Sequence, residues 1–204
     1  MNQTNKSDSS AKIVIFDVDD ILWALNRKMT AMTGIDYDKL VVYSILENEL
    51  LPEEDRKNAY AVYTGHELFE NIEWYDGIER INKLNADIRI NSNSLNEKAT
   101  EMKREQLKSV LTLTDDKILI HNVKDEKKKK IIDGAFILVD DSPYNIASST
   151  AKYNIVLKQP WNSSPEMEKM MRQNGTGFIY CDSLNQIIDL IEMLLSNERR
   201  PWSY

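Results

Sequence analysis

Cysteine and histidine are scarce in this sequence of 204 residues. The chain contains one cysteine, Cys181, and two histidines. A lone thiol cannot form an internal disulfide, and without a cluster of cysteine and histidine residues we expect no structural zinc site. A reducing compartment is the simplest interpretation, and we therefore predict an intracellular, cytoplasmic protein.

Long apolar runs and an excess of positive charge are also missing. No stretch approaches the roughly 18 apolar residues of a membrane-spanning helix, and the polar residues 1–11 lack the apolar core of a signal peptide. Asp and Glu number 33 against 26 Lys and Arg, a net charge of −7. We therefore expect neither a membrane nor a nucleic-acid polymer as partner. Residues 1–11 are predicted to be a disordered tail.

Short runs of β-branched and aromatic residues recur along the chain, with helical patterns between them. Such runs are typical of strands that are buried on both faces, as in parallel sheets. We predict an α/β fold with a Rossmann-like, mostly parallel sheet flanked by helices. The predicted strands are residues 12–17, 88–91, 117–121, 136–140, 154–157 and 178–181, and the predicted helices of this core are 77–84, 96–110, 142–151 and 184–195.

Residues 25–75 interrupt this alternation, because they contain no convincing strand. An apolar pattern at residues 40–46 fits one face of a helix, and residues 52–63 predict another helix with proline in its first turn. About 50 residues is too long for a plain connection in a compact α/β domain. We therefore predict a small helical cap at 25–75, inserted after the first strand, and a core formed by residues 12–24 and 76–197.

Acidic and polar residues stand where the predicted strands end, which is where open parallel sheets gather functional groups. The set consists of Asp17, Asp19 and Asp20 after the first strand, Ser92, Asn93 and Ser94 in the second strand's exit, Asp140 and Asp141 after the fourth strand, and Lys130 ten residues before Asp140. Within the second group we favour Ser92 as the functional hydroxyl, because it directly follows the apolar alternation. Asn93 or Ser94 is expected to cap the next helix.

These residue types are suited to phosphoryl chemistry. Clustered carboxylates repel one another, and a hard divalent cation such as Mg²⁺ resolves the conflict. A lysine and a hydroxyl beside the cation can hold phosphoryl oxygens. One aspartate can attack phosphorus to form an aspartyl-phosphate, and a second acid can protonate the leaving oxygen and then activate water.

The motifs Phe16-Asp17-Val18-Asp19-Asp20, Ser92, Lys130 and Asp140-Asp141 resemble, in order and strand context, the four motifs of the haloacid dehalogenase superfamily of phosphohydrolases. The paired aspartates alone are common, but four motifs in order at strand ends are specific. The resemblance implies Asp17 as nucleophile, Asp19 as general acid/base, Ser92, Asn93 and Lys130 as phosphate ligands, and Asp17, Asp19, Asp140 and Asp141 as Mg²⁺ ligands.

A narrower resemblance is to the 5'(3')-deoxyribonucleotidase family of that superfamily. The position of the cap, the stretch 67–77 that leads out of it, the spacing from Lys130 to Asp140 and the segment 156–162 carry this resemblance. The second motif departs from the family's frequent threonine-serine-proline run, and Asp20 stands where glycine is frequent. The resemblance implies an Mg²⁺-dependent phosphomonoesterase whose small-molecule substrate is a (deoxy)nucleoside monophosphate. We expect a monomer or a homodimer.

Aromatic residues near the predicted cap have two interpretations. Trp23, Phe69 and Trp74 are candidates for a pocket that binds the base, although aromatic residues at such positions are commonly core. Two alternative functions also stay open. One is a phosphatase for a sugar phosphate or another small phosphoester, and the other is a non-catalytic binding protein on the same scaffold.

Overall fold

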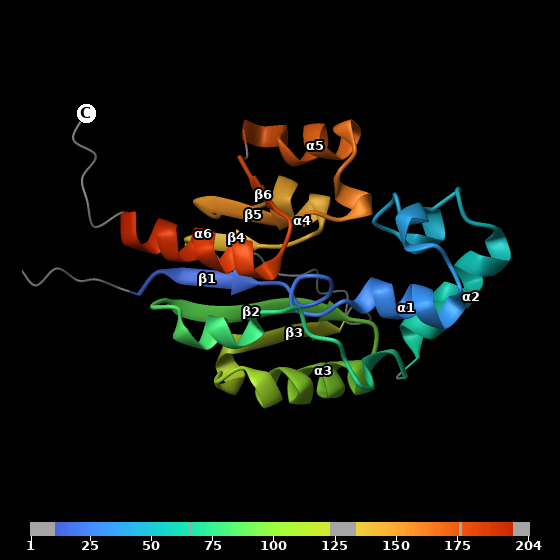
Figure 1. The fold of residues 1–204 in the computed structure, drawn as a ribbon, viewed down its shortest axis with the longest axis horizontal. Coiled ribbons are helices and arrows are strands. Elements are labelled where there is room, and N and C mark those ends of the chain that lie inside the picture. The colour runs from blue at the N-terminus through green and yellow to red at the C-terminus, as the bar shows by residue number, and fades with distance from the viewer. Residues whose placement is uncertain (1–10, 66, 123–133, 176, 198–204) are drawn as a thin grey trace, which may run out of the picture.

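A computed structural model describes residues 11–65, 67–122, 134–175 and 177–197 of the chain. Its centre is a parallel sheet of six strands in the order β3-β2-β1-β4-β5-β6 (Figure 1). The strands are β1 (Ile13–Phe16), β2 (Asp87–Ser94), β3 (Ile118–Asn122), β4 (Ile137–Val139), β5 (Tyr153–Leu157) and β6 (Ile179–Cys181). The predicted α/β class and all six predicted strands are confirmed.

Helices cover both faces of the sheet, which explains why its central strands are apolar throughout. Side chains alternate between the faces of a strand. Val14 and Phe16 of β1 belong to the cluster that includes α3 and α6, whereas Ile15 packs in a second cluster with α4 and α5. The α-helices are α1 (Leu25–Thr33), α2 (Glu53–Thr64), α3 (Glu97–Val110), α4 (Pro143–Ala147), α5 (Pro165–Met171) and α6 (Leu184–Asn197).

Short 3₁₀ turns complete the connections. The helix expected at 77–84 forms, but its turns are 3₁₀ rather than α-helical. It follows Gly77, whose φ is 94°. The turns are η1 (Tyr37–Lys39), η2 (Ile45–Glu47), η3 (Glu67–Phe69), η4 (Ile78–Lys83), η5 (Asp115–Lys117), η7 (Pro160–Asn162) and η8 (Gln173–Gly175). Within the described residues, no helix has the length and apolar run that crossing a membrane requires.

The segment 25–75, called the cap segment below, contains α1, α2 and three 3₁₀ turns between β1 and β2. Figure 1 shows α1 and α2 beyond the carboxyl ends of the strands. Its two stems run side by side: Trp23 pairs with Trp74 in an antiparallel bridge, and the N–H of Tyr75 donates to the carbonyl of Leu22 (2.9 Å). The division of the chain into a core and a separate cap stays a prediction.

The prediction of a helix at residues 40–46 is wrong. The chain there forms only the 3₁₀ turn η2. Asn48, whose side chain is fully buried, donates from Nδ2 to the carbonyl of Lys39 (2.6 Å) and accepts from the N–H of Leu50 (3.2 Å). A side-chain amide that bonds to backbone groups in this way competes with helical hydrogen bonds. The β-branched and aromatic run Val41-Val42-Tyr43 also has little preference for helix.

The predicted disordered tail lies outside the described residues, apart from Ala11. The helix at residues 52–63 is confirmed as α2, and those at 96–110 and 184–195 as α3 and α6. The helix expected at 142–151 is shorter than predicted. It begins at Pro143 after the capping residue Ser142 and ends at Ala147.

Candidate active site

Three buried aspartates meet at the carboxyl ends of β1 and β4. The chain continues from β1 to β2 on one side and reaches β4 on the other, and such a reversal of strand order opens a crevice in α/β sheets. Asp17 follows β1 directly, and its N–H donates to the carbonyl of Val139 at the end of β4 (2.9 Å). Asp140 and Asp141 follow Val139. One carboxylate oxygen from each aspartate lies within 4.8 Å of the others.

This acidic group fits a hard divalent cation. Burial, and then the neighbouring Asp140 and Asp17, raise the pKa of Asp141 well above its usual value. Buried carboxylates that repel one another need a proton or a positive charge, and oxygen-only ligands favour Mg²⁺ over zinc. Asp17, Asp140 and Asp141 are therefore the residues that could hold Mg²⁺ through their side chains.

Neighbouring side chains fix the orientation of two of these aspartates. Nδ2 of Asn145 lies 3.1 Å from both carboxylate oxygens of Asp140, and the N–H of Ser142 donates to Oδ1 (2.9 Å). Nε1 of Trp161 donates to Oδ2 of Asp141 (2.9 Å). Sequence reasoning missed Asn145. Its position in the short helix that Ser142-Pro143 begins is the signal that could have identified it.

Asp19 lies outside the acidic group. Its Oδ1 accepts from Nε1 of Trp23 (2.8 Å), and its Oδ2 accepts from Nζ of Lys103 (2.7 Å). Burial raises the pKa of Asp19, an effect that Lys103 opposes and Asp17 reinforces. These two bonds occupy the side chain of Asp19, whereas its predicted contact with Mg²⁺ is through the backbone carbonyl and stays a prediction.

Asp20 takes the backbone conformation that glycine adopts most readily. Its φ is 56°, in the left-handed region where aspartate is among the better-tolerated residues. Its side chain is buried, and Oδ1 accepts from the N–H of Asn26 in the first turn of α1 (3.0 Å). The departure from the glycine of the resembled family therefore keeps the turn and adds a contact to the cap segment.

Ser92 and Asn93 lie on β2 rather than after it. The strand runs to Ser94, so Ser92 pairs with Ile120 and Asn93 with His121 on β3. Both residues line the same cavity as Asp17 and Asp19. The structure therefore brings the predicted serine beside the predicted nucleophile.

The expectation that Asn93 or Ser94 caps the following helix is wrong. Asn96 caps α3, because its Oδ1 accepts from the N–H of Ala99 (2.8 Å). Ser94 instead bonds through Oγ to the hydroxyl of Thr100. Because β2 extends to Ser94, the capping residue lies two residues beyond it and the helix begins at Glu97.

Lys130 falls in residues 123–133, outside the described residues, so its role as a phosphate ligand stays a prediction. Another lysine, Lys103 of α3, lies at the described site and is 1% exposed. Sequence reasoning missed it. Ala99, Lys103 and Leu107 are spaced by four residues and form the buried face of α3, so a lysine between two apolar positions was the available signal.

The three aromatic residues proposed for a base pocket lie elsewhere. Trp23 and Phe69 are buried in the hydrophobic core, and neither they nor Trp74 line the cavity at Asp17. The ring centroids of Trp23 and Trp74 are 5.2 Å apart. Trp23 and Phe69 therefore belong to the hydrophobic core, and Trp74 packs against it, as the second interpretation of these aromatic residues expects.

The cavity that Asp17 and Asp19 line measures about 270 Å³ and lies between the sheet and the cap segment. Its lining combines the acidic residues of the site with aromatic and aliphatic side chains from α1, α2 and the loop between them. The lining residues are Asp17, Asp19, Asp20, Asn26, Met29, Tyr43, Ser44, Ile45, Leu46, Tyr60, Tyr63, Ser92, Asn93, Leu95, Asp141 and Asn145.

Comparison with solved structures identifies the fold. A conserved haloacid dehalogenase-like protein of unknown function from Agrobacterium tumefaciens is 14% identical with a TM-score of 0.55, over 91% of this chain and 99% of that one. A candidate phosphatase from Clostridium difficile is 15% identical with a TM-score of 0.52, over 89% and 99%. A candidate β-phosphoglucomutase from Bacteroides vulgatus is 12% identical with a TM-score of 0.54, over 94% and 91%. The chain has the haloacid dehalogenase-like fold.

At these identities, the similarity establishes the haloacid dehalogenase-like fold and not an activity. No family model matches the chain, and no curated protein matches it. The narrower resemblance to the 5'(3')-deoxyribonucleotidases stays a prediction.

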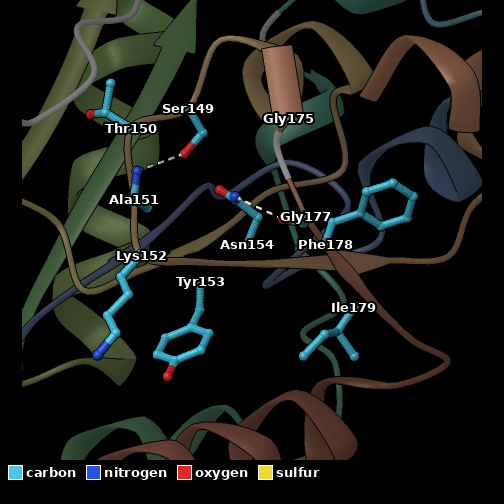
Figure 2. Close-up of a pocket in the computed structure, with 10 residues that line it drawn as sticks. All are labelled: Ser149, Thr150, Ala151, Lys152, Tyr153, Asn154, Gly175, Gly177, Phe178 and Ile179. Atoms are coloured by element: carbon cyan, nitrogen blue, oxygen red, sulfur yellow. Dashed lines mark hydrogen bonds between the residues drawn. The ribbon is translucent and has the colours of Figure 1, made fainter. Parts of the chain in front are cut away.

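A second cavity, of about 500 Å³, lies at the other end of the strands, beside the amino ends of β5 and β6 (Figure 2). Asn154 donates there from Nδ2 to the carbonyl of Gly177 (3.0 Å). The described residues that line it include no carboxylate, thiol or imidazole. The candidate catalytic side chains therefore gather at the cavity beside Asp17 and not at this one.

We expect Trp23→Ala to destabilise the protein. Trp23 is fully buried, and truncation of such a side chain typically costs about 3–5 kcal/mol of unfolding free energy. Urea unfolding followed by circular dichroism measures the loss, and Tyr60→Ala, at a 43% exposed position, is the control with a small effect. A Trp23→Ala protein of unchanged stability and altered substrate ranking would restore the base-pocket hypothesis.

Proposed function

We propose that this chain is an Mg²⁺-dependent phosphomonoesterase that works through an aspartyl-phosphate. The observation that carries the proposal is the grouping of Asp17, Asp140 and Asp141, whose oxygens lie within 4.8 Å of one another. The fold shared with haloacid dehalogenase-like proteins supports it, as does the placement of Asp19 and Ser92 on the wall of the same cavity.

Asp17 is the proposed nucleophile. A carboxylate oxygen of Asp17 forms a bond to phosphorus while the bond from phosphorus to the alcohol oxygen breaks. Asp19 gives a proton to the departing oxygen and later takes one from the water that hydrolyses the aspartyl-phosphate. Ser92, Asn93 and Lys130 are the proposed ligands of the phosphoryl oxygens.

Mg²⁺, when bound by the side chains of Asp17, Asp140 and Asp141 and the backbone carbonyl of Asp19, supplies positive charge that balances the acidic group and the substrate phosphate. Asn145 and Trp161 hold the carboxylates of Asp140 and Asp141 through the hydrogen bonds described above. Preorientation of this kind lowers the cost of gathering like charges around one cation.

The proposed substrate is a (deoxy)nucleoside monophosphate. The cap segment lines its part of the cavity with Tyr43, Ile45, Leu46, Tyr60 and Tyr63, and the described lining there includes no lysine or arginine. A wall of this kind favours a leaving group without further negative charge and with a flat or apolar face. A nucleoside meets both conditions, whereas a second phosphate does not.

Three of these side chains are available to a ligand. Tyr43, Leu46 and Tyr60 are 43%, 46% and 43% exposed although they line the cavity. Burial and the nearby carboxylates raise the pKa of Tyr63 well above its usual value, so its phenol stays neutral and able to donate a hydrogen bond. These contacts support tyrosines of the cap segment, in place of Trp23, Phe69 and Trp74, as the proposed aromatic surface for the base.

The test is a screen of phosphomonoesters at saturating Mg²⁺, in which nucleoside monophosphates should be hydrolysed faster than sugar phosphates. A preference for sugar phosphates would leave the chemistry and overturn the proposed substrate. Binding of orthovanadate without turnover of any monoester would overturn the proposed phosphomonoesterase activity and favour a non-catalytic binding protein.

Tyr60→Ala should raise KM for nucleoside monophosphates by about tenfold, because stacking of a base on an aromatic ring is worth about 1–3 kcal/mol. Its matched control is Leu50→Ala, an exposed apolar residue of the cap segment that does not line the cavity. KM for p-nitrophenyl phosphate should change little in either variant. Equal KM values for Tyr60→Ala and Leu50→Ala with nucleotides would remove Tyr60 from the proposed pocket.

A further inference from the structure

Lys103 is a lysine whose side chain is almost entirely removed from solvent. It is 1% exposed and lies on the apolar face of α3 between Ala99 and Leu107. Burial of an ammonium group is costly unless hydrogen bonds and an opposite charge compensate it. The compensating groups of Lys103 all belong to the wall of the proposed active site.

The ammonium group contacts three acceptors on two elements. Nζ lies 2.7 Å from Oδ2 of Asp19, 2.7 Å from the carbonyl of Asn93 and 3.4 Å from Oγ of Ser92. An ammonium group has three protons to donate, so these contacts use its capacity. Lys103 thereby ties the loop after β1 to the carboxyl end of β2.

Both oxygens of Asp19 are fixed by this arrangement. Oδ2 accepts from Lys103, and Oδ1 accepts from Nε1 of Trp23 at 2.8 Å. The rings of Trp23 and Phe69 flank the ammonium group, with centroids 5.7 and 5.8 Å from Nζ. Cation–π contacts and the exclusion of water strengthen a charged hydrogen bond in such a site.

Stability alone is a weak explanation for a buried ion pair, because replacing one with apolar residues is often neutral or stabilising. Here the pair joins three residues that line one cavity, Asp19, Ser92 and Asn93, from behind its wall. A carboxylate that transfers a proton must be held in a narrow range of positions relative to the reacting oxygen. The bonds from Lys103 and Trp23 restrict the carboxyl group of Asp19 in this way, which suits a role in proton transfer.

We propose that Lys103 is a positioning residue that holds the carboxyl group of Asp19 in the orientation for proton transfer to the leaving alcohol. The inference rests on the proposed phosphomonoesterase function. In that reaction Asp17 bonds to phosphorus, the bond from phosphorus to the alcohol oxygen breaks, and the proton of Asp19 passes to that oxygen. Lys103 acts through Asp19 and touches neither the phosphorus nor the leaving group.

The test compares two leaving groups in Lys103→Met. Methionine has a similar length, and its thioether suits the space between two aromatic rings. Loss of a general acid typically costs about 10²–10⁴-fold in rate, so kcat for the best alkyl monoester should fall by at least about 100-fold. p-Nitrophenolate leaves without a proton, so the pre-steady-state burst from p-nitrophenyl phosphate should keep its rate within about threefold of the native protein's.

Lys108→Met is the matched control on the same helix. Lys108 pairs with Asp115 at the surface and lines no part of the cavity. Both rates should stay within about threefold of native, as expected for an exposed ion pair. An equal loss of alkyl turnover and of the burst in Lys103→Met would show that the lysine acts on the phosphoryl group or on the fold, and would overturn the proposal. Failure of Lys103→Met to fold would overturn it too.

A double-mutant cycle on the melting temperature tests the pair without any substrate. Lys103→Met and Asp19→Asn should each change the melting temperature, and the double variant should differ from the sum of the two changes because the residues interact directly. Additive changes would show that the pair does not form. If the native protein hydrolyses no monoester, the proposed function fails, and the cycle still decides whether Lys103 holds Asp19.

Discussion

Asp17→Asn is expected to abolish turnover and to leave the fold intact. An amide is a far poorer nucleophile than a carboxylate, and removal of a covalent nucleophile from a serine hydrolase costs on the order of 10⁶-fold in kcat. We expect a loss of more than about 10⁴-fold here. Steady-state release of phosphate from the best monoester, at saturating Mg²⁺, measures it.

The stability of the same variant should move in the opposite direction. Asp17 lies with Asp140 and Asp141 in one buried group, and asparagine removes one of three mutually repelling charges. The melting temperature of the metal-free protein should therefore rise. Asp116→Asn, at an exposed position, is the control and should change neither activity nor melting temperature measurably. Near-native turnover by a clean preparation of Asp17→Asn would exclude Asp17 as the nucleophile.

Removal of divalent cations is the second change with a large expected effect. Exhaustive chelation should abolish turnover, and Mg²⁺ should restore it, because the acidic group offers only hard oxygen ligands. Mg²⁺ should also raise the melting temperature of the native protein, since a ligand that binds only the folded state stabilises it. Full activity after chelation would contradict the metal site.

Substitutions of Asp140 and Asn145 test the metal site further, because each should weaken Mg²⁺ binding in a different way. Asp140→Asn removes a proposed ligand and should raise the Mg²⁺ concentration for half-maximal rate. Asn145→Ala leaves the ligand but removes the amide that bonds to both of its oxygens, and loss of such a support typically costs about 10–100-fold in metal affinity. An unchanged Mg²⁺ titration for Asp140→Asn would mean that the ligand has been misplaced.

The sheet could be predicted because its signal is local. A strand buried on both faces is a short apolar run, and each of the six runs became a strand. Asp17 and Asp140 directly follow two such runs, and β1 and β4 are neighbours, so the acidic group follows from strand order.

Helical details were less predictable, although some signals were present. The helix α5 was not predicted, yet Ser164-Pro165-Glu166 is the capping residue, proline and acid with which helices often begin. The predicted helix at 40–46 failed because the side chain of Asn48 bonds to backbone groups on either side of it. Apolar spacing alone does not report such competition.

Lys103 shows why part of the site stayed hidden. Its partner Asp19 is 84 positions away in the sequence, and lysine is usually a surface residue. No local pattern connects the two. Only the packing of α3 against β2 places the ammonium group behind the cavity wall, with Trp23 and Phe69 around it.

The paired stems of the cap segment have a consequence for how such a protein can change. The N–H of Ala24 donates to the carbonyl of Glu73 (3.1 Å), so the polypeptide departs from the sheet and comes back at a single point. The closure entropy of a loop between those two residues depends only weakly on its length, so a replacement segment has mainly to refill the core positions of Leu68 and Phe69. We expect that a segment of different sequence, joined at this one point and packed on the same core positions, would change which molecules bind above the carboxylates without moving Asp17, Asp140 or Asp141.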